Sequence, residues 1–223
     1  MKTPAGRTES LTRMLEPGPG LVWSMVAGGI LWMVHGYFRF IMPFGPDAEW
    51  RADLQYSPIL STERFLLYNS PGVVALLLTA WAAFSYLRSL PGTRPGLQRT
   101  ARILAVLAIL FGLIAAVGLA VLFVPPTTGG ISLGVPLLGL ALLLAGLSVL
   151  WDRQDLHGHS GLLGRMLVIL GLVGMFTLPV QPLMYALALL PLAVGTAVFA
   201  LFGAGWVAVA INLSSVARSA QRE

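Results

Sequence analysis

Two titratable residues lie one helical turn apart in an apolar stretch near the start of the chain. His35 and Arg39 have i, i+4 spacing, which places both side chains on one face of a helix. A cation at the centre of a membrane helix costs about 2.5 to 3.5 kcal/mol, so such a residue normally faces a cavity or a partner. Arg39 could instead extend to the lipid headgroups, and His35 could be a packed core histidine. The pair nevertheless marks the first candidate for a polar pocket.

An acidic loop follows this pair and could supply a partner for the arginine. The loop 43–69 contains Asp47 and Glu49, and our hypothesis is that it folds over the pocket so that one of the two carboxylates pairs with the guanidinium. Tyr37 and Tyr86 are expected beside the same pocket. Together with the histidine and the arginine, these four residues complete the predicted ligand-binding set.

A second polar cluster lies in a short connection later in the chain. It contains Asp152, Asp155, His157 and His159 within eight positions. Carboxylate and neutral imidazole are suitable ligands for zinc or a similar ion. A short turn between two apolar stretches must be polar in any case, so we predict no metal site and keep these four residues as weak candidates.

Several absences narrow the classes of function. The cores of the apolar stretches hold no Asp, Glu or Lys, whereas ion-coupled carriers commonly use a buried carboxylate. Only one histidine lies in these stretches, so bis-histidine haem ligation is not expected. The sequence has no cysteine and no HExxH or GxSxG motif, which removes thiolate chemistry and the recognisable hydrolases. We therefore predict no cofactor and favour a non-enzymatic role.

Six apolar stretches must position these residues. Each holds the roughly 17 to 25 residues that a hydrocarbon core requires, and they cover about 21–42, 71–89, 101–124, 131–151, 162–180 and 183–213. With 57% apolar and only 10% charged residues, a soluble protein of 223 residues could not cover its surface with polar groups. The sequence predicts an all-α transmembrane bundle of six helices over 21–213, between an N-terminal segment 1–20 and a tail 214–223.

Serine and proline residues indicate where helices begin. Ser61 is suited to start a short interfacial helix through Tyr68, and Ser70 with Pro71 is expected to start the second span, since Ser can cap and Pro at the first helical position loses no hydrogen bond. The run 125–130, which contains two prolines and two glycines, predicts a short turn.

Four further prolines give expectations for the last three spans. Pro179 and Pro182 are expected to bracket the final turn of the bundle. Pro136 and Pro191 fall inside the predicted fourth and sixth spans, where each should bend its helix.

The basic residues alternate between connections. Eleven of the fourteen lie on the side of the chain's two ends, whereas the opposite side has only Arg39, Arg51 and Arg64. Because cytoplasmic loops carry an excess of Lys and Arg, both termini are predicted to be cytoplasmic. The charges are spread over several short loops rather than one face, so no nucleic-acid partner is expected. One lysine among fourteen basic residues, with abundant Ala, Gly and Leu, is typical of a GC-rich bacterial genome, and we expect an inner-membrane location.

Two short motifs carry a resemblance to known proteins. With six spans, Tyr56-Ser57-Pro58 in an outer first loop and Ser70-Pro71 at the second span, the chain resembles a family of uncharacterised six-span bacterial membrane proteins. It departs from that family by lacking a histidine at the start of its fourth span. The resemblance implies architecture and location, and no activity.

The residues favour an integral membrane protein that binds a lipid, a small amphiphile or a membrane partner protein. The alternative is an uncoupled transporter or permease component with an outward-facing pocket near His35 and Arg39. A polar cavity that reaches mid-membrane would favour transport, whereas a solidly packed apolar bundle would favour a scaffold.

Overall fold

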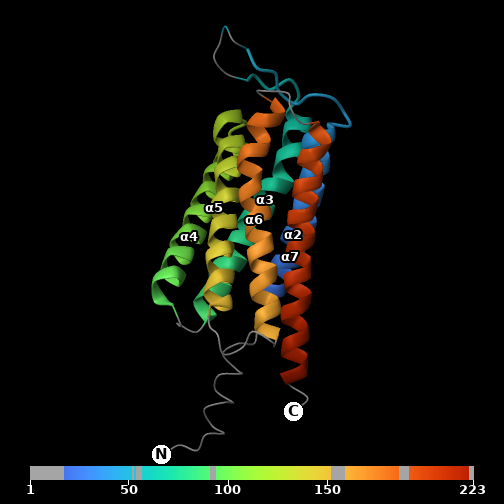
Figure 1. Ribbon diagram of the computed structural model, residues 1–223. Coiled ribbons are helices and arrows are strands. Elements are labelled where there is room, and N and C mark those ends of the chain that lie inside the picture. The colour runs from blue at the N-terminus through green and yellow to red at the C-terminus, as the bar shows by residue number, and fades with distance from the viewer. Residues whose placement is uncertain are drawn as a thin grey trace, which may run out of the picture.

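The computed structural model describes residues 18–51, 53, 57–90, 94–151, 159–185 and 191–220. Within them the structure has six helices, and an isolated bridge joins Ala48 and Ile59. The helices are α2 (Pro19–Ile41), α3 (Thr62–Ser89), α4 (Pro95–Ala120), α5 (Val124–Leu150), α6 (His159–Tyr185) and α7 (Leu192–Ala220) (Figure 1). Each is long and apolar enough to cross a membrane, which confirms the predicted all-helical bundle of six spans.

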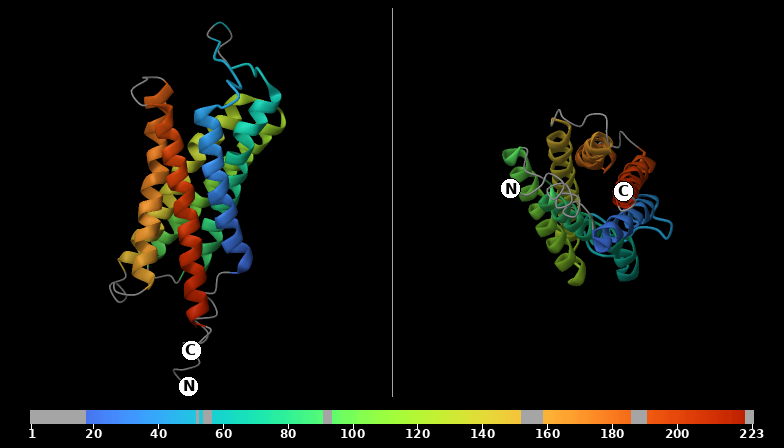
Figure 2. Two further views of the ribbon diagram at one scale, coloured as in Figure 1. Left: turned by 90° about the vertical axis from the view of Figure 1, so that its right-hand side faces the viewer. Right: turned by 90° about the horizontal axis from the view of Figure 1, so that it is seen from below.

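The six helices form a closed ring of antiparallel neighbours. Each helix packs against the next along the chain, α7 packs against α2 and so closes the ring, and α5 also contacts α3 (Figure 2). Helix α2 begins and α7 ends at the same end of the bundle (Figure 1). The opposite end carries residues 42–61, and we call it the loop end.

Helix α3 begins earlier than predicted because one serine caps it. The Ser61 hydroxyl accepts a hydrogen bond from the Arg64 backbone N–H at 3.4 Å, so the predicted helix start at Ser61 is confirmed. The predicted second start at Ser70 is wrong, since the helix runs without interruption through Pro71. A proline inside a membrane helix is tolerated where a neighbouring side chain satisfies the backbone groups of the disturbed turn.

Helix α5 also begins earlier than predicted. The run 125–130 is helical, and the turn between α4 and α5 is instead formed by residues 121–123. Two prolines fit into the first turn of α5 because the first N–H groups of a helix have no intrahelical acceptor. Pro136 lies inside α5, as predicted.

The end of α6 and the start of α7 correct two further expectations. Pro179 and Pro182 lie within α6, which continues to Tyr185, so they do not bracket a turn. A continued helix is favoured in lipid because it satisfies most of its backbone groups internally. Pro191 precedes α7, which begins at Leu192, so the predicted kink at Pro191 is wrong. The proline costs no helical hydrogen bond in that position.

Close backbone contact between α2 and α7 positions an aromatic layer in the middle of the bundle. A Cβ atom on Gly29 would lie 2.6 Å from the Gly203 carbonyl oxygen, so only glycine permits this approach. Trp32 is fully buried, and its ring stacks on Phe199 at 5.3 Å and meets Phe202 edge-on at 5.7 Å. The layer thus joins α2 and α7.

Parts of the predicted terminal segments and of one motif lie outside the described residues. These parts are residues 1–17 of the segment 1–20, residues 221–223 of the tail 214–223, and Tyr56 of the loop motif. The rest of the tail belongs to α7, which extends to Ala220.

Candidate functional site

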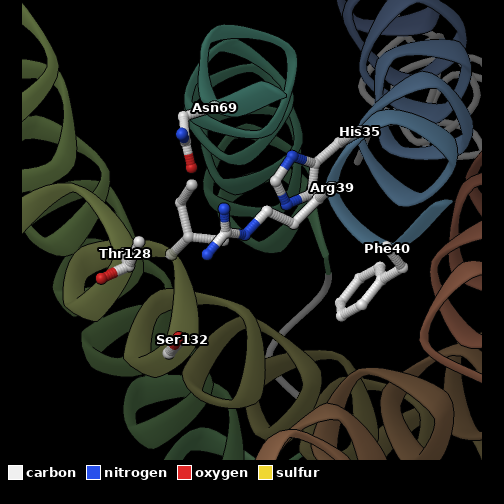
Figure 3. A pocket seen from close by; sticks show the side chains of 7 residues that line it. His35, Arg39, Phe40, Asn69, Thr128 and Ser132 are labelled. Atoms are coloured by element: carbon white, nitrogen blue, oxygen red, sulfur yellow. The ribbon is translucent and has the colours of Figure 1, made fainter. Parts of the chain in front are cut away.

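A cavity of about 40 Å³ lies between three helices at the loop end. Because about 10 to 15 Å³ admits one water, it has room for a small polar group of a few atoms. Helices α2, α3 and α5 line it with His35, Arg39, Phe40, Asn69, Thr128, Ile131 and Ser132 (Figure 3).

Arg39 forms the predicted ion pair with the loop. Its Nη1 donates to Oδ1 and Oδ2 of Asp47 at 3.0 and 3.1 Å. The Asp47 side chain is only 3% exposed and that of Arg39 is 21% exposed, so the pair is largely shielded from water. Glu49 is exposed, and its backbone N–H donates to the Pro58 carbonyl at 3.2 Å. Asp47 is therefore the carboxylate that the loop places on Arg39.

Hydrogen bonds to α3 hold the loop in this position. The Asp47 carbonyl accepts from the Leu60 N–H at 2.8 Å, just before α3 begins. The Tyr68 hydroxyl donates to the Gly45 carbonyl at 2.9 Å and accepts from the Phe44 N–H at 3.1 Å. The tyrosine thus fixes the segment that delivers the carboxylate.

Asn69 connects the ion pair to the cavity. Its Nδ2 donates to Oδ2 of Asp47 at 3.1 Å and to the Phe65 carbonyl at 2.8 Å. Both partners are pure acceptors, so the amide nitrogen must face them and the orientation of the side chain is fixed. Asn69 is 1% exposed, and its Oδ1 has no hydrogen-bond partner among the described residues. A buried acceptor of this kind costs about 1 to 3 kcal/mol when it stays unpaired.

His35 is fixed against the proline-containing turn of α3. Its Nδ1 lies 2.9 Å from the Tyr68 carbonyl oxygen, and because a carbonyl only accepts, Nδ1 carries the proton. Nε2 then bears a lone pair in the neutral ring. A Cβ atom on Gly72 would lie 2.7 Å from Nδ1, so glycine at position 72 makes room for the imidazole. His35 is thus both a packed core histidine and a cavity residue.

Helix α5 supplies two hydroxyl groups and part of the apolar wall. The Thr128 hydroxyl donates to the Val124 carbonyl at 3.0 Å, so its oxygen can still accept a hydrogen bond. Ser132 lies one turn later, and buried Ile131 lies between them. Sequence reasoning placed Thr128 in a turn, and it placed Ile131 and Ser132 at the start of the fourth span without a signal that they face a cavity.

Two predicted residues lie elsewhere. Tyr37 is half exposed, and its ring packs edge-on against Phe38 at 5.5 Å. Tyr86 is buried in α3 seventeen residues after Asn69, which corresponds to about 25 Å along the helix. The structure brings neither tyrosine to the cavity wall.

The structure does not describe the side chains of the weak metal candidates. Asp152, Asp155 and His157 lie outside the described residues, as does the side chain of His159, the residue at which α6 begins. Among the residues that are described, no three His, Asp or Glu side chains come together in a way that could hold a metal ion.

The side chains around the cavity offer several hydrogen-bonding groups. Asp47 accepts from Arg39 and Asn69, and Nδ1 of His35 donates to the Tyr68 carbonyl. The cavity lining includes the guanidinium of Arg39, the amide of Asn69 and an apolar wall. Comparisons of the chain with protein-family models, with curated proteins and with solved structures found no match.

Proposed function

We propose that this integral membrane protein binds the polar end of a small amphiphile in the cavity between α2, α3 and α5. The observation that carries the proposal is Asn69, which lines the cavity and whose buried Oδ1 lacks a hydrogen-bond partner among the described residues. Phe40 and Ile131 add an apolar wall, and a few placed polar groups on apolar walls are typical of small-molecule sites.

The layer beneath the cavity favours binding over passage. Trp32 meets His35 edge-on at 5.9 Å and stacks on Phe199, and both aromatic residues are buried. A transporter would need a path past this layer, because alternating access exposes a site near mid-membrane to each side in turn. The geometry therefore supports a binding protein better than the transporter alternative.

The proposal includes an orientation. The loop end faces the outside of a bacterial inner membrane, and both termini are cytoplasmic. The support is the excess of Lys and Arg on the connections at the other end of the bundle, and an outward-facing loop end would open the site to solutes and outer-leaflet lipids. Membrane lipids are the partners of the exposed apolar helix faces.

Two neighbouring residues on α5 provide the test. Ile131 is 3% exposed and lines the cavity, whereas Leu133 is 47% exposed on the outside of the bundle. Ile131→Phe should fill the cavity, and Leu133→Phe adds the same ring on the exposed face. Native mass spectrometry of each protein, purified from membranes, should find a small-molecule adduct in the wild type and in Leu133→Phe that is lost in Ile131→Phe.

The proposal fails if the wild type carries no adduct, or if all three proteins retain it equally. Size-exclusion chromatography and the thermal unfolding midpoint serve as the control for folding. An Ile131→Phe protein that unfolds early is replaced by Ser132→Leu, which fills the same cavity from the next position.

A further inference from the structure

We infer that the cavity selects a neutral group that both donates and accepts a hydrogen bond, of which a hydroxyl is the simplest. This inference rests on the proposed function and names the chemical class of the ligand. It follows from the hydrogen-bond valences that the side chains leave open and from the balance of charge around them.

The side chain of Asn69 requires a hydrogen-bond donor on the ligand. Both N–H bonds of its amide are directed to acceptors, one on Asp47 and one on Phe65, so the amide cannot turn without placing an oxygen against a carboxylate. Its Oδ1 remains buried and unpartnered. A ligand that only accepts hydrogen bonds leaves this atom unsatisfied.

The side chain of Arg39 favours a hydrogen-bond acceptor on the ligand. Nη1 makes both bonds to Asp47, and the guanidinium also carries N–H groups on Nε and Nη2, for which the described residues provide no acceptor. Figure 3 shows the Arg39 side chain extending from α2 across the cavity toward Asn69 and Thr128. One hydroxyl placed between the arginine and Asn69 can accept from the first and donate to the second.

The charges of the site disfavour ions of either sign. Arg39 and Asp47 form a 3.0 Å pair whose net charge is zero. A carboxylate ligand would meet the unpaired amide oxygen of Asn69, which repels it, while the charge of Arg39 is already paired with Asp47. An ammonium group would lie beside the guanidinium. A neutral head group avoids both costs.

The hydroxyl could belong to a short free alcohol or to the head of a membrane amphiphile. A cavity of about 40 Å³ holds only the head group and the first few carbons in either case. A direct comparison of ligands therefore tests the shared chemistry first and the source second.

The experiment titrates the full chain in detergent with ligands that share one chain length and differ in head group. Isothermal titration calorimetry measures the binding of each ligand. The ligands are 1-octanol, octyl methyl ether, octanoate and octylamine, and the binding that Ile131→Phe abolishes is taken as cavity binding. We expect 1-octanol to bind about tenfold more tightly than the ether, because the ether cannot donate to Asn69. Octanoate and octylamine should bind more weakly than 1-octanol.

An Asn69→Leu variant completes the comparison. Without the amide oxygen, the preference for 1-octanol over the ether should disappear, so that the two ligands bind with about equal affinity. If this variant does not fold, the ligand series on the wild type alone decides. Competition by 1-propanol and by 1-oleoylglycerol then distinguishes a free alcohol from a lipid head.

The outcomes separate the two proposals. Cavity binding in which octanoate, octylamine or the ether equals or exceeds 1-octanol overturns the selection of a neutral donor and acceptor, and leaves the proposed function in place. If Ile131→Phe changes the binding of none of the ligands, both fail.

Discussion

The buried carboxylate of Asp47 is stabilised by two side chains from different helices. Arg39 reaches it from α2 and Asn69 from α3, and both contacts are short and shielded from water. A buried charge of this kind depends on its partners far more than an exposed one does. At the scale of single residues, this network attaches the loop to two helices through a buried charge.

Removal of the arginine should therefore destabilise the protein. Arg39→Gln leaves Asp47 buried with one donor fewer, and we expect a loss of about 2 to 4 kcal/mol in the free energy of unfolding. Arg51→Gln is the matched control, because the Arg51–Asp53 pair is 52% and 60% exposed, and it should change stability by less than about 0.5 kcal/mol. Equal shifts of the unfolding midpoint in the two variants would contradict this account of Asp47.

The space at Gly72 allows a second prediction. In Gly72→Ala the new methyl group would lie 2.7 Å from the imidazole of His35, which is buried and hydrogen-bonded and therefore cannot move freely. We expect a loss of about 1 to 3 kcal/mol in the free energy of unfolding, as in other overpacked cores. Gly96→Ala has open space around it and should have little effect, so an equally large loss in both variants would refute the packing argument.

At the scale of elements, the loop and α3 behave as one unit. The Tyr68 hydroxyl makes two hydrogen bonds to the loop backbone, and Ser61 caps the helix that carries this tyrosine. These hydrogen bonds let the loop deliver Asp47 to α2.

Loss of one hydroxyl should loosen this unit. Tyr68→Phe keeps the ring and removes both hydrogen bonds, so hydrogen exchange over residues 42–51 should become faster by about fivefold or more. Tyr37→Phe removes a half-exposed hydroxyl from α2 and should leave exchange in this segment unchanged. Identical exchange in wild type and Tyr68→Phe would show that the tyrosine does not hold the loop.

The positions at which the helices begin and end explain which site residues could be predicted from the sequence. Hydropathy marks the apolar part of each helix but not the polar turns by which a membrane helix extends beyond it, so the sequence pattern assigns Asn69 and Thr128 to loops. The i, i+4 spacing identified His35 and Arg39 because it is local. Their convergence with α3 and α5 depends on tertiary packing, which one sequence does not encode as a visible pattern.

At the scale of the whole molecule, six helices in a closed ring hold a polar cavity near the loop end and an aromatic layer below it. The proposed orientation can be tested directly, because the chain has no cysteine. In intact cells, Glu63→Cys should react with a membrane-impermeant maleimide, whereas Gly96→Cys should react only after permeabilisation. The reverse pattern would place the loop end in the cytoplasm.

Protection of the cavity by a ligand tests the central claim most directly. A single cysteine at Ser132 lines the cavity, and one at Leu133 faces outward and serves as the control. The rate at which a small thiol reagent modifies Ser132→Cys in the purified protein should fall in the presence of saturating 1-octanol, while the rate at Leu133→Cys stays the same. A rate at Ser132→Cys that stays unchanged with 1-octanol and with each of the other three octyl ligands, or an equal decrease at both positions, would contradict a binding site in this cavity.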